Sequence, residues 1–79
     1  MFNKITNYFK NEDYSLCIKE NKIYIDNYES LIDIDESNLS VLVKGKKIKI
    51  YGKNLIINKL VEKELLISGI IERVDLFDR

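Results

Sequence analysis

From Tyr14 onward, apolar and polar residues alternate with a period of two, which is typical of strands buried on one face. Short stretches rich in Asn, Asp, Ser, Glu, Lys or Gly interrupt the alternation and predict turns. The strands predicted between them cover residues 14–18, 22–26, 31–35, 39–43, 47–51, 55–61 and 65–77. Strands this short joined by such turns indicate a mainly β fold, an antiparallel meander forming a curled sheet or a small open barrel. The alternative is a β-solenoid, although no tandem repeat supports it.

The first twelve residues follow a different period. Phe2, Ile5 and Phe9 recur at spacings of three and four, which predicts a short amphipathic helix over residues 1–12. A helix of this length is marginal alone, so we expect its apolar face to dock on the sheet, the alternatives being a partner or a membrane surface. The expected organisation is this helix followed by one β domain over residues 13–79.

The last predicted strand is long, and its alternation slips by one residue. Its inward positions run from Leu65 to Ile71, whereas the next apolar residues are Val74 and Leu76. Because a one-residue slip turns every later side chain to the other face, we expect a β-bulge near residues 72–73. The residues predicted to share one buried face are Ile23, Ile25, Ile34, Val41, Val43, Ile48, Ile50, Leu55, Ile57, Ile67 and Ile71.

Turn and packing positions are expected at four residues. Asn27 opens a predicted turn, and Gly45 closes a hairpin in which a positive φ is available to it. We expect Gly52 and Gly69 to be structural, needed for a positive φ or for a close approach of the backbone. None of the three glycines has the spacing of a phosphate-binding loop.

The composition argues against catalysis. The chain has no His, which removes the commonest general acid–base and the commonest neutral metal ligand. Cys17 is the only cysteine and is expected to be a small buried apolar residue in a reducing compartment. Asp33 and Asp35 could contact a divalent ion, but without a third placed ligand they are read as a solvated strand face. We therefore expect no enzymatic activity, no cofactor and no metal.

Charge is balanced overall but divided locally. Residues 26–36 hold five acids and no base, and residues 44–53 hold five lysines and no acid. The two stretches could pair within one molecule, or form complementary edges or a site for a charged protein. A third reading is that the lysine hairpin grips single-stranded nucleic acid. The candidate protein-binding residues are Lys46, Lys47, Lys49, Asp33 and Asp35.

Three blocks of this pattern, in order, resemble the YabP/YqfC family of sporulation proteins, with the YqfC branch nearer. They read IYIDNY at residues 23–28, KIKIYGKNLII at 47–57 and ELLISGIIERV at 64–74. The resemblance runs from about Ser15 to Phe77. It implies a non-enzymatic protein of the mother-cell cytoplasm, at the forespore surface, acting in late forespore maturation such as cortex or coat assembly.

The resemblance also implies a protein partner, namely a membrane-anchored sporulation protein encoded beside it; self-association is a further expectation. No membrane span is expected, because no stretch approaches the roughly 20 apolar residues that a span needs. No leader sequence is expected either, since residues 1–4 lead into polar residues. The alternative function is a small nucleic-acid-binding module of OB or Sm-like type using the hairpin between Lys44 and Lys53.

Overall fold

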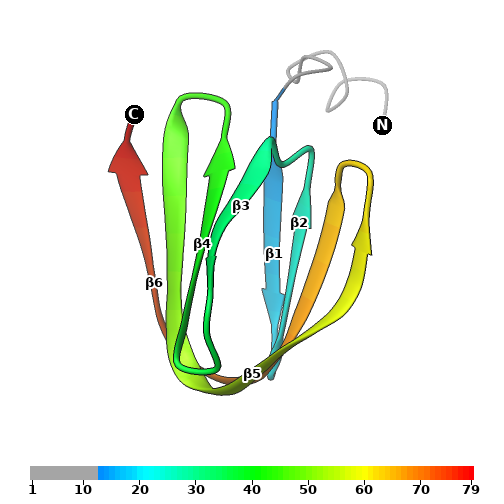
Figure 1. Cartoon of the computed structure of the whole chain (residues 1–79), viewed down its shortest axis with the longest axis vertical. Coiled ribbons are helices and arrows are strands. Elements are labelled where there is room, and N and C mark those ends of the chain that lie inside the picture. The colour runs from blue at the N-terminus through cyan, green and yellow to red at the C-terminus, as the bar shows by residue number, and fades with distance from the viewer. Residues whose placement is uncertain (1–12) are drawn as a thin grey trace, which may run out of the picture.

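A computed structural model describes residues 13–79, which form a single antiparallel sheet of six strands (Figure 1). The strands are β1 (Ser15–Lys19), β2 (Lys22–Asp26), β3 (Ser30–Ile34), β4 (Asn38–Val43), β5 (Lys46–Val61) and β6 (Glu64–Asp78). The prediction of a mainly β fold with an open, curled sheet is confirmed. The helix predicted over residues 1–12 lies outside the described residues.

The order of strands in the sheet is β1-β2-β6-β5-β4-β3, so a plain meander was the wrong topology. In a meander β2 and β3 would be neighbours, whereas here they lie on opposite sides of the long hairpin made by β5 and β6. The β6 strand pairs with β2 through residues 64–68, and β5 pairs with β4 through residues 46–51. The antiparallel order also rules out a solenoid for the described chain.

The β5–β6 hairpin bends into a U, which gives the sheet two arms (Figure 1). The β4 arm consists, in order, of β3, β4, residues 46–51 of β5 and residues 73–78 of β6. The β2 arm consists, in order, of β1, β2, residues 64–68 of β6 and residues 56–61 of β5. The connection between β2 and β3 joins the arms at the end away from the bend, where Asn27 N–H donates to Lys63 O at 2.6 Å and Glu29 N–H donates to Leu42 O at 2.8 Å.

Two glycines permit the bend. A Cβ on Gly52 would lie 2.0 Å from Ile70 O, and one on Gly69, where φ is +137°, would lie 2.7 Å from Asn54 O. Both are the close backbone approaches expected at these positions. Residues 52–54 were predicted to be a turn between two strands, but they lie within one continuous bent strand. A turn and a bend use the same residue types, so the pattern could not separate them.

Side chains from both arms meet in one core. The ten buried apolar residues are Ile23, Ile25, Leu39, Val41, Val43, Ile48, Ile50, Leu55, Leu65 and Ile67. Eight of them were among the eleven predicted for this face, and Ile57 and Ile71 pack against it partly buried. Burial of each such side chain contributes about 1.5–3 kcal/mol, so the core is what fixes the two arms against each other.

The prediction that the eleventh residue, Ile34, is buried is wrong, because its side chain is 66% exposed. It belongs to β3, which is an edge strand, and an irregular register between Leu31 and Asp33 precedes it. Cys17 is also exposed rather than buried. Its neighbour Leu16 pairs with the core residue Ile25, so the alternation turns Cys17 to the outer face.

The predicted bulge in the last strand is confirmed. Tyr51 pairs with Arg73, whereas the next residue of β5, Gly52, pairs with Ile71, so Glu72 is the extra residue with no place in the β5 register. The extra residue restores inward-facing apolar side chains on both sides of the bend, because Val74 and Ile71 both pack against the core.

Candidate protein-binding surfaces

The lysine stretch lies on an interior strand of the β4 arm, not at an edge of the sheet. Residues 46–51 of β5 have β4 on one side and β6 on the other. Since Ile48 and Ile50 face the core, Lys47 and Lys49 face outward. The backbone of this stretch is therefore paired on both sides, with β4 and with β6. An edge-to-edge contact through these lysines is therefore not open to this fold.

Of the two outward lysines, Lys49 has a carboxylate opposite it, whereas Lys47 lies between Leu42 and Phe77. One row across the sheet runs through Cα partners from Asp33 on β3 to Ser40, Lys49 and Asp75 on β6. The surface is thus mixed in charge rather than uniformly basic. The Ser40 side chain is fully buried in this row, and its hydroxyl has no hydrogen-bond partner.

Lys46 at the start of β5 pairs with the far end of β6. Its Nζ donates to Asp78 Oδ1 at 2.5 Å. This hydrogen bond raises the pKa of the Lys46 ammonium and lowers that of the Asp78 carboxyl. The Nζ atom of Lys53 lies 3.8 Å from Oε2 of Glu72, which is also on β6. In these two ion pairs the partners of the lysine stretch come from β6 and not from the acidic stretch of residues 26–36.

The aromatic ring beside the lysines is already occupied by cations. Arg73 Cζ lies 4.3 Å from the centroid of the Tyr51 ring, and Lys49 Nζ lies 5.2 Å from it. Cation–π contacts of this kind use the ring face that a nucleotide base would stack on. Both cations thus lie close to the ring that the nucleic-acid hypothesis would use for base stacking.

Asp33 and Asp35, the other candidate residues, lie in different elements, since Asp33 is on β3 and Asp35 is in the turn between β3 and β4. Asp35 Oδ1 accepts hydrogen bonds from Ser37 N–H at 3.1 Å and from the Ser37 hydroxyl at 3.2 Å. Its carboxylate thus shapes the turn, as short acidic side chains commonly do. Asp33 faces outward opposite Ser40. Among residues 13–79, no group of three His, Cys, Asp or Glu side chains is placed to hold a metal ion.

Asn27 and Gly45 hold the ends of the arms. Asn27 has a φ of +65°, and its side-chain amide donates to Asp13 O at 2.9 Å. Gly45, with a φ of +77°, occupies the hairpin between β4 and β5, where its carbonyl accepts from Arg79 N–H at 3.2 Å. These are turn positions of the kind predicted, and each also joins the turn to a distant part of the chain.

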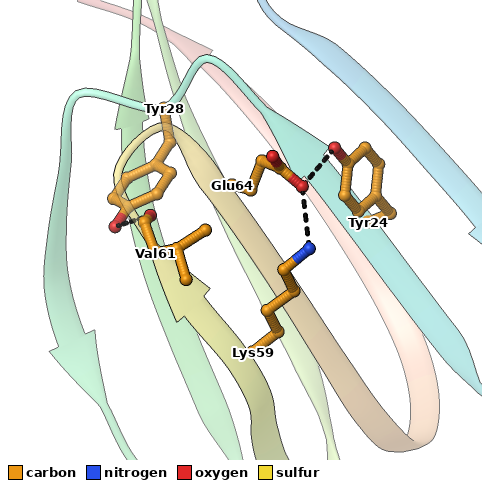
Figure 2. Close-up of polar contacts among 5 residues, drawn as sticks. All are labelled: Tyr24, Tyr28, Lys59, Val61 and Glu64. Carbon is orange, nitrogen blue, oxygen red and sulfur yellow. Dashed lines mark hydrogen bonds and ion pairs between the residues drawn. The ribbon is translucent and has the colours of Figure 1, made fainter.

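A polar cluster lies on the outer face of the β2 arm (Figure 2). Glu64 Oε1 accepts hydrogen bonds from Lys59 Nζ at 3.1 Å and from the Tyr24 hydroxyl at 3.0 Å. The bond from Lys59, and then that from Tyr24, lowers the pKa of the Glu64 carboxyl. Burial, followed by the bond to Glu64, raises the pKa of Tyr24. A carboxylate held ionised in this way stabilises the arm and is poorly suited to accept a proton in catalysis.

This cluster gives a pH-dependent prediction. A carboxyl whose pKa is lowered by folding contributes its full stability above its ordinary pKa, and that contribution is lost as the pH falls from there through the lowered pKa of the folded state. Glu64→Gln should therefore lose less stability than the wild type between pH 7 and about 3.5. Urea unfolding at the two pH values measures the difference, with Glu62→Gln in the adjacent turn as the control. Equal losses in wild type and Glu64→Gln would contradict this role.

Large exposed apolar side chains gather at the open edges of the sheet. Each of the nine such residues in the described chain lies on a strand segment that has a neighbouring strand on one side only: Ile18 on β1, Ile32 and Ile34 on β3, Ile56, Leu60 and Val61 on β5, and Ile70, Leu76 and Phe77 on β6. The sequence pattern missed this gathering, because residues 56–61 and 70–78 are edges only because β4 pairs with residues 46–51 of β5 and β2 pairs with residues 64–68 of β6. The one signal in the sequence that could have indicated these edges is that both segments carry apolar residues on both faces.

The β5 edge over residues 56–61 is limited at both ends. At one end Leu55 N–H donates to Glu36 O at 2.9 Å. At the other, the Tyr28 hydroxyl donates to Val61 O at 3.3 Å (Figure 2). Between these points β5 pairs with β6 alone. The edge is thus a defined segment, about as long as one short strand.

No helix in the described chain is long and apolar enough to cross a membrane. Comparisons with models of protein families, with curated proteins and with solved structures find no match.

Proposed function

We propose that this protein is a non-catalytic component of a protein assembly and binds its partner by accepting a strand at the β5 edge over residues 56–61. The observation that carries the proposal is the gathering of exposed apolar side chains at open sheet edges. Natural sheets usually protect such edges with charge, Pro or a covering element, and leave them open where a partner strand is added.

The β5 edge suits an added strand best because its exposed apolar side chains lie on the same segment that has no second neighbouring strand. Ile56 is 59% exposed and Leu60 is 51% exposed. Main-chain hydrogen bonds would provide affinity, and these side chains would provide the apolar contact. The capped ends at Leu55 and Val61 would set the length of the partner segment.

The process we propose is spore formation, on the resemblance to the YabP/YqfC family. In that setting the partner is the membrane-anchored sporulation protein encoded beside this one, and the site of action is the mother-cell cytoplasm at the forespore surface, in cortex or coat assembly. The absence of His from the sequence supports a binding role over an acid–base enzyme.

Titration calorimetry with the soluble domain of that partner tests the proposal. Ile56→Glu combined with Leu60→Glu should weaken binding about tenfold or more, because charge at an edge opposes strand addition. Ile18→Glu on β1 is the control and should bind like the wild type. Equal binding by the β5 variant, or salt-dependent binding of a single-stranded oligonucleotide instead of the protein, would contradict it.

A further inference from the structure

The longest open edge of the sheet is the second half of β6. From Ile70 to Asp78 this strand pairs only with β5, because β2 reaches no farther along it than Ser68. In Figure 1 the red end of β6 forms the left margin of the sheet, with no strand beyond it. Ile70, Leu76 and Phe77 are exposed along this segment. An open edge of this length is a surface on which another strand can add.

Charges on this edge alternate in a way that complements a copy of itself. Arg73 and Asp75 face outward, since their partners on β5 are Tyr51 and Lys49. Within one chain Arg73 Nη2 lies 2.9 Å from Asp75 Oδ2. The residue between them, Val74, faces the core side opposite Ile50. The edge thus carries a cation and an anion symmetrically placed about Val74.

We propose that a second copy of this chain pairs antiparallel along this edge, with a two-fold axis at Val74. A two-fold axis perpendicular to the sheet makes residue pairs whose numbers have a constant sum. With the axis at Val74, Arg73 of each copy lies opposite Asp75 of the other. Opposite charges directly across two strands are favourable, and like charges are unfavourable.

Neighbouring registers lack this match. An axis at Asp75 places the two Asp75 carboxylates opposite each other, and an axis at Arg73 does the same with the two guanidinium groups. The Val74 register also brings the exposed Leu76 and Phe77 of each copy toward the segment of the other that ends in Ile70. Charge selects the register, and apolar burial with backbone pairing holds the dimer.

This dimer uses a different edge from the partner contact proposed above and does not depend on it. The two β4 arms would become one continuous sheet, and each β5 edge would stay available. Monomeric variants should therefore still bind the partner, which separates the failure of one proposal from that of the other.

The test is a charge exchange measured by analytical ultracentrifugation of the full chain. Arg73→Asp places four carboxylates at the axis and should weaken dimerisation about tenfold or more. Asp75→Arg places four guanidinium groups there and should have the same effect. The double variant Arg73→Asp with Asp75→Arg restores opposite charges across the axis and should restore the dimer. Lys19→Asp on β1 is the control, expected to dimerise like the wild type, and circular dichroism verifies that each variant is folded.

A wild type that stays monomeric at high concentration would overturn the proposal. So would a dimer that Arg73→Asp leaves unchanged, or one that the double variant fails to restore. The double variant also restores the ion pair between residues 73 and 75 within one chain. A single variant that is folded by circular dichroism but no longer dimerises therefore shows that the charges act across the axis.

Discussion

Replacing Ile50 with Asp should abolish the cooperative unfolding transition of this protein. Ile50 is fully buried, lies on the interior half of β5 and pairs with Leu39 on one side and Val74 on the other. An unpaired carboxylate at this position costs several kcal/mol, and a domain of this size has only about 5 kcal/mol to lose. Circular dichroism during thermal and urea denaturation measures the loss.

The control is the same substitution at Ile34. This residue has the same chemistry and also follows a period-two pattern, but its side chain is exposed at the β3 edge. Ile34→Asp should leave stability within about 0.5 kcal/mol of the wild type, as ordinary surface substitutions do. A folded, cooperative Ile50→Asp protein would show that the core has been placed on the wrong face.

Replacing Gly52 with Ala or Val should destabilise the protein by about 3 kcal/mol or more. The obstacle is the first added carbon, since a Cβ would lie 2.0 Å from the carbonyl oxygen of Ile70 and 3.0 Å from Leu55 Cδ2. The carbonyl belongs to the backbone of β6 and cannot move without opening the bend. Alanine should therefore be nearly as harmful as valine, and chemical denaturation of both variants tests this.

Gly45 provides the comparison. Its positive φ disfavours any other residue, but a Cβ there would meet no atom within 4 Å. Gly45→Ala should cost only the backbone strain, about 1 kcal/mol. If Gly52→Ala proved no more harmful than Gly45→Ala, the close approach at the bend would not be a determinant of the fold.

Local features of the fold could be predicted from the sequence because they depend on neighbouring residues. The alternation of Ile48 and Ile50 with lysines identified the inner face, and the slip between Ile71 and Val74 identified the bulge. Strand order could not be obtained in this way. Nothing in the period-two pattern says that β6, the last strand, enters between β2 and β5.

The candidate surfaces show the same division. The alternation with Ile48 and Ile50 indicated that Lys47 and Lys49 face outward, but nothing in the chain indicated that β6 would supply the carboxylates for Lys46 and Lys53. The open edges were invisible for a geometric reason: a strand is an edge only relative to its neighbours. Ile56 and Ile70 have the pattern of ordinary strand residues, and only the strand order and the short pairings of β4 and β2 leave each with a neighbour on one side.

The central hairpin also has a consequence for synthesis on the ribosome. Of the described strands, β5 and β6 alone pair with both arms: β2 pairs with β6, and β4 pairs with β5. The hairpin of β1 and β2 therefore has no sheet to join until residues 64–68 have been made. A nascent chain that ends before Glu64 can form the β1–β2 hairpin and the three paired strands β3, β4 and β5, but not the core that both arms share. Completion of the core must wait for residues 64–68 to emerge, and the apolar side chains of β2 remain uncovered until then.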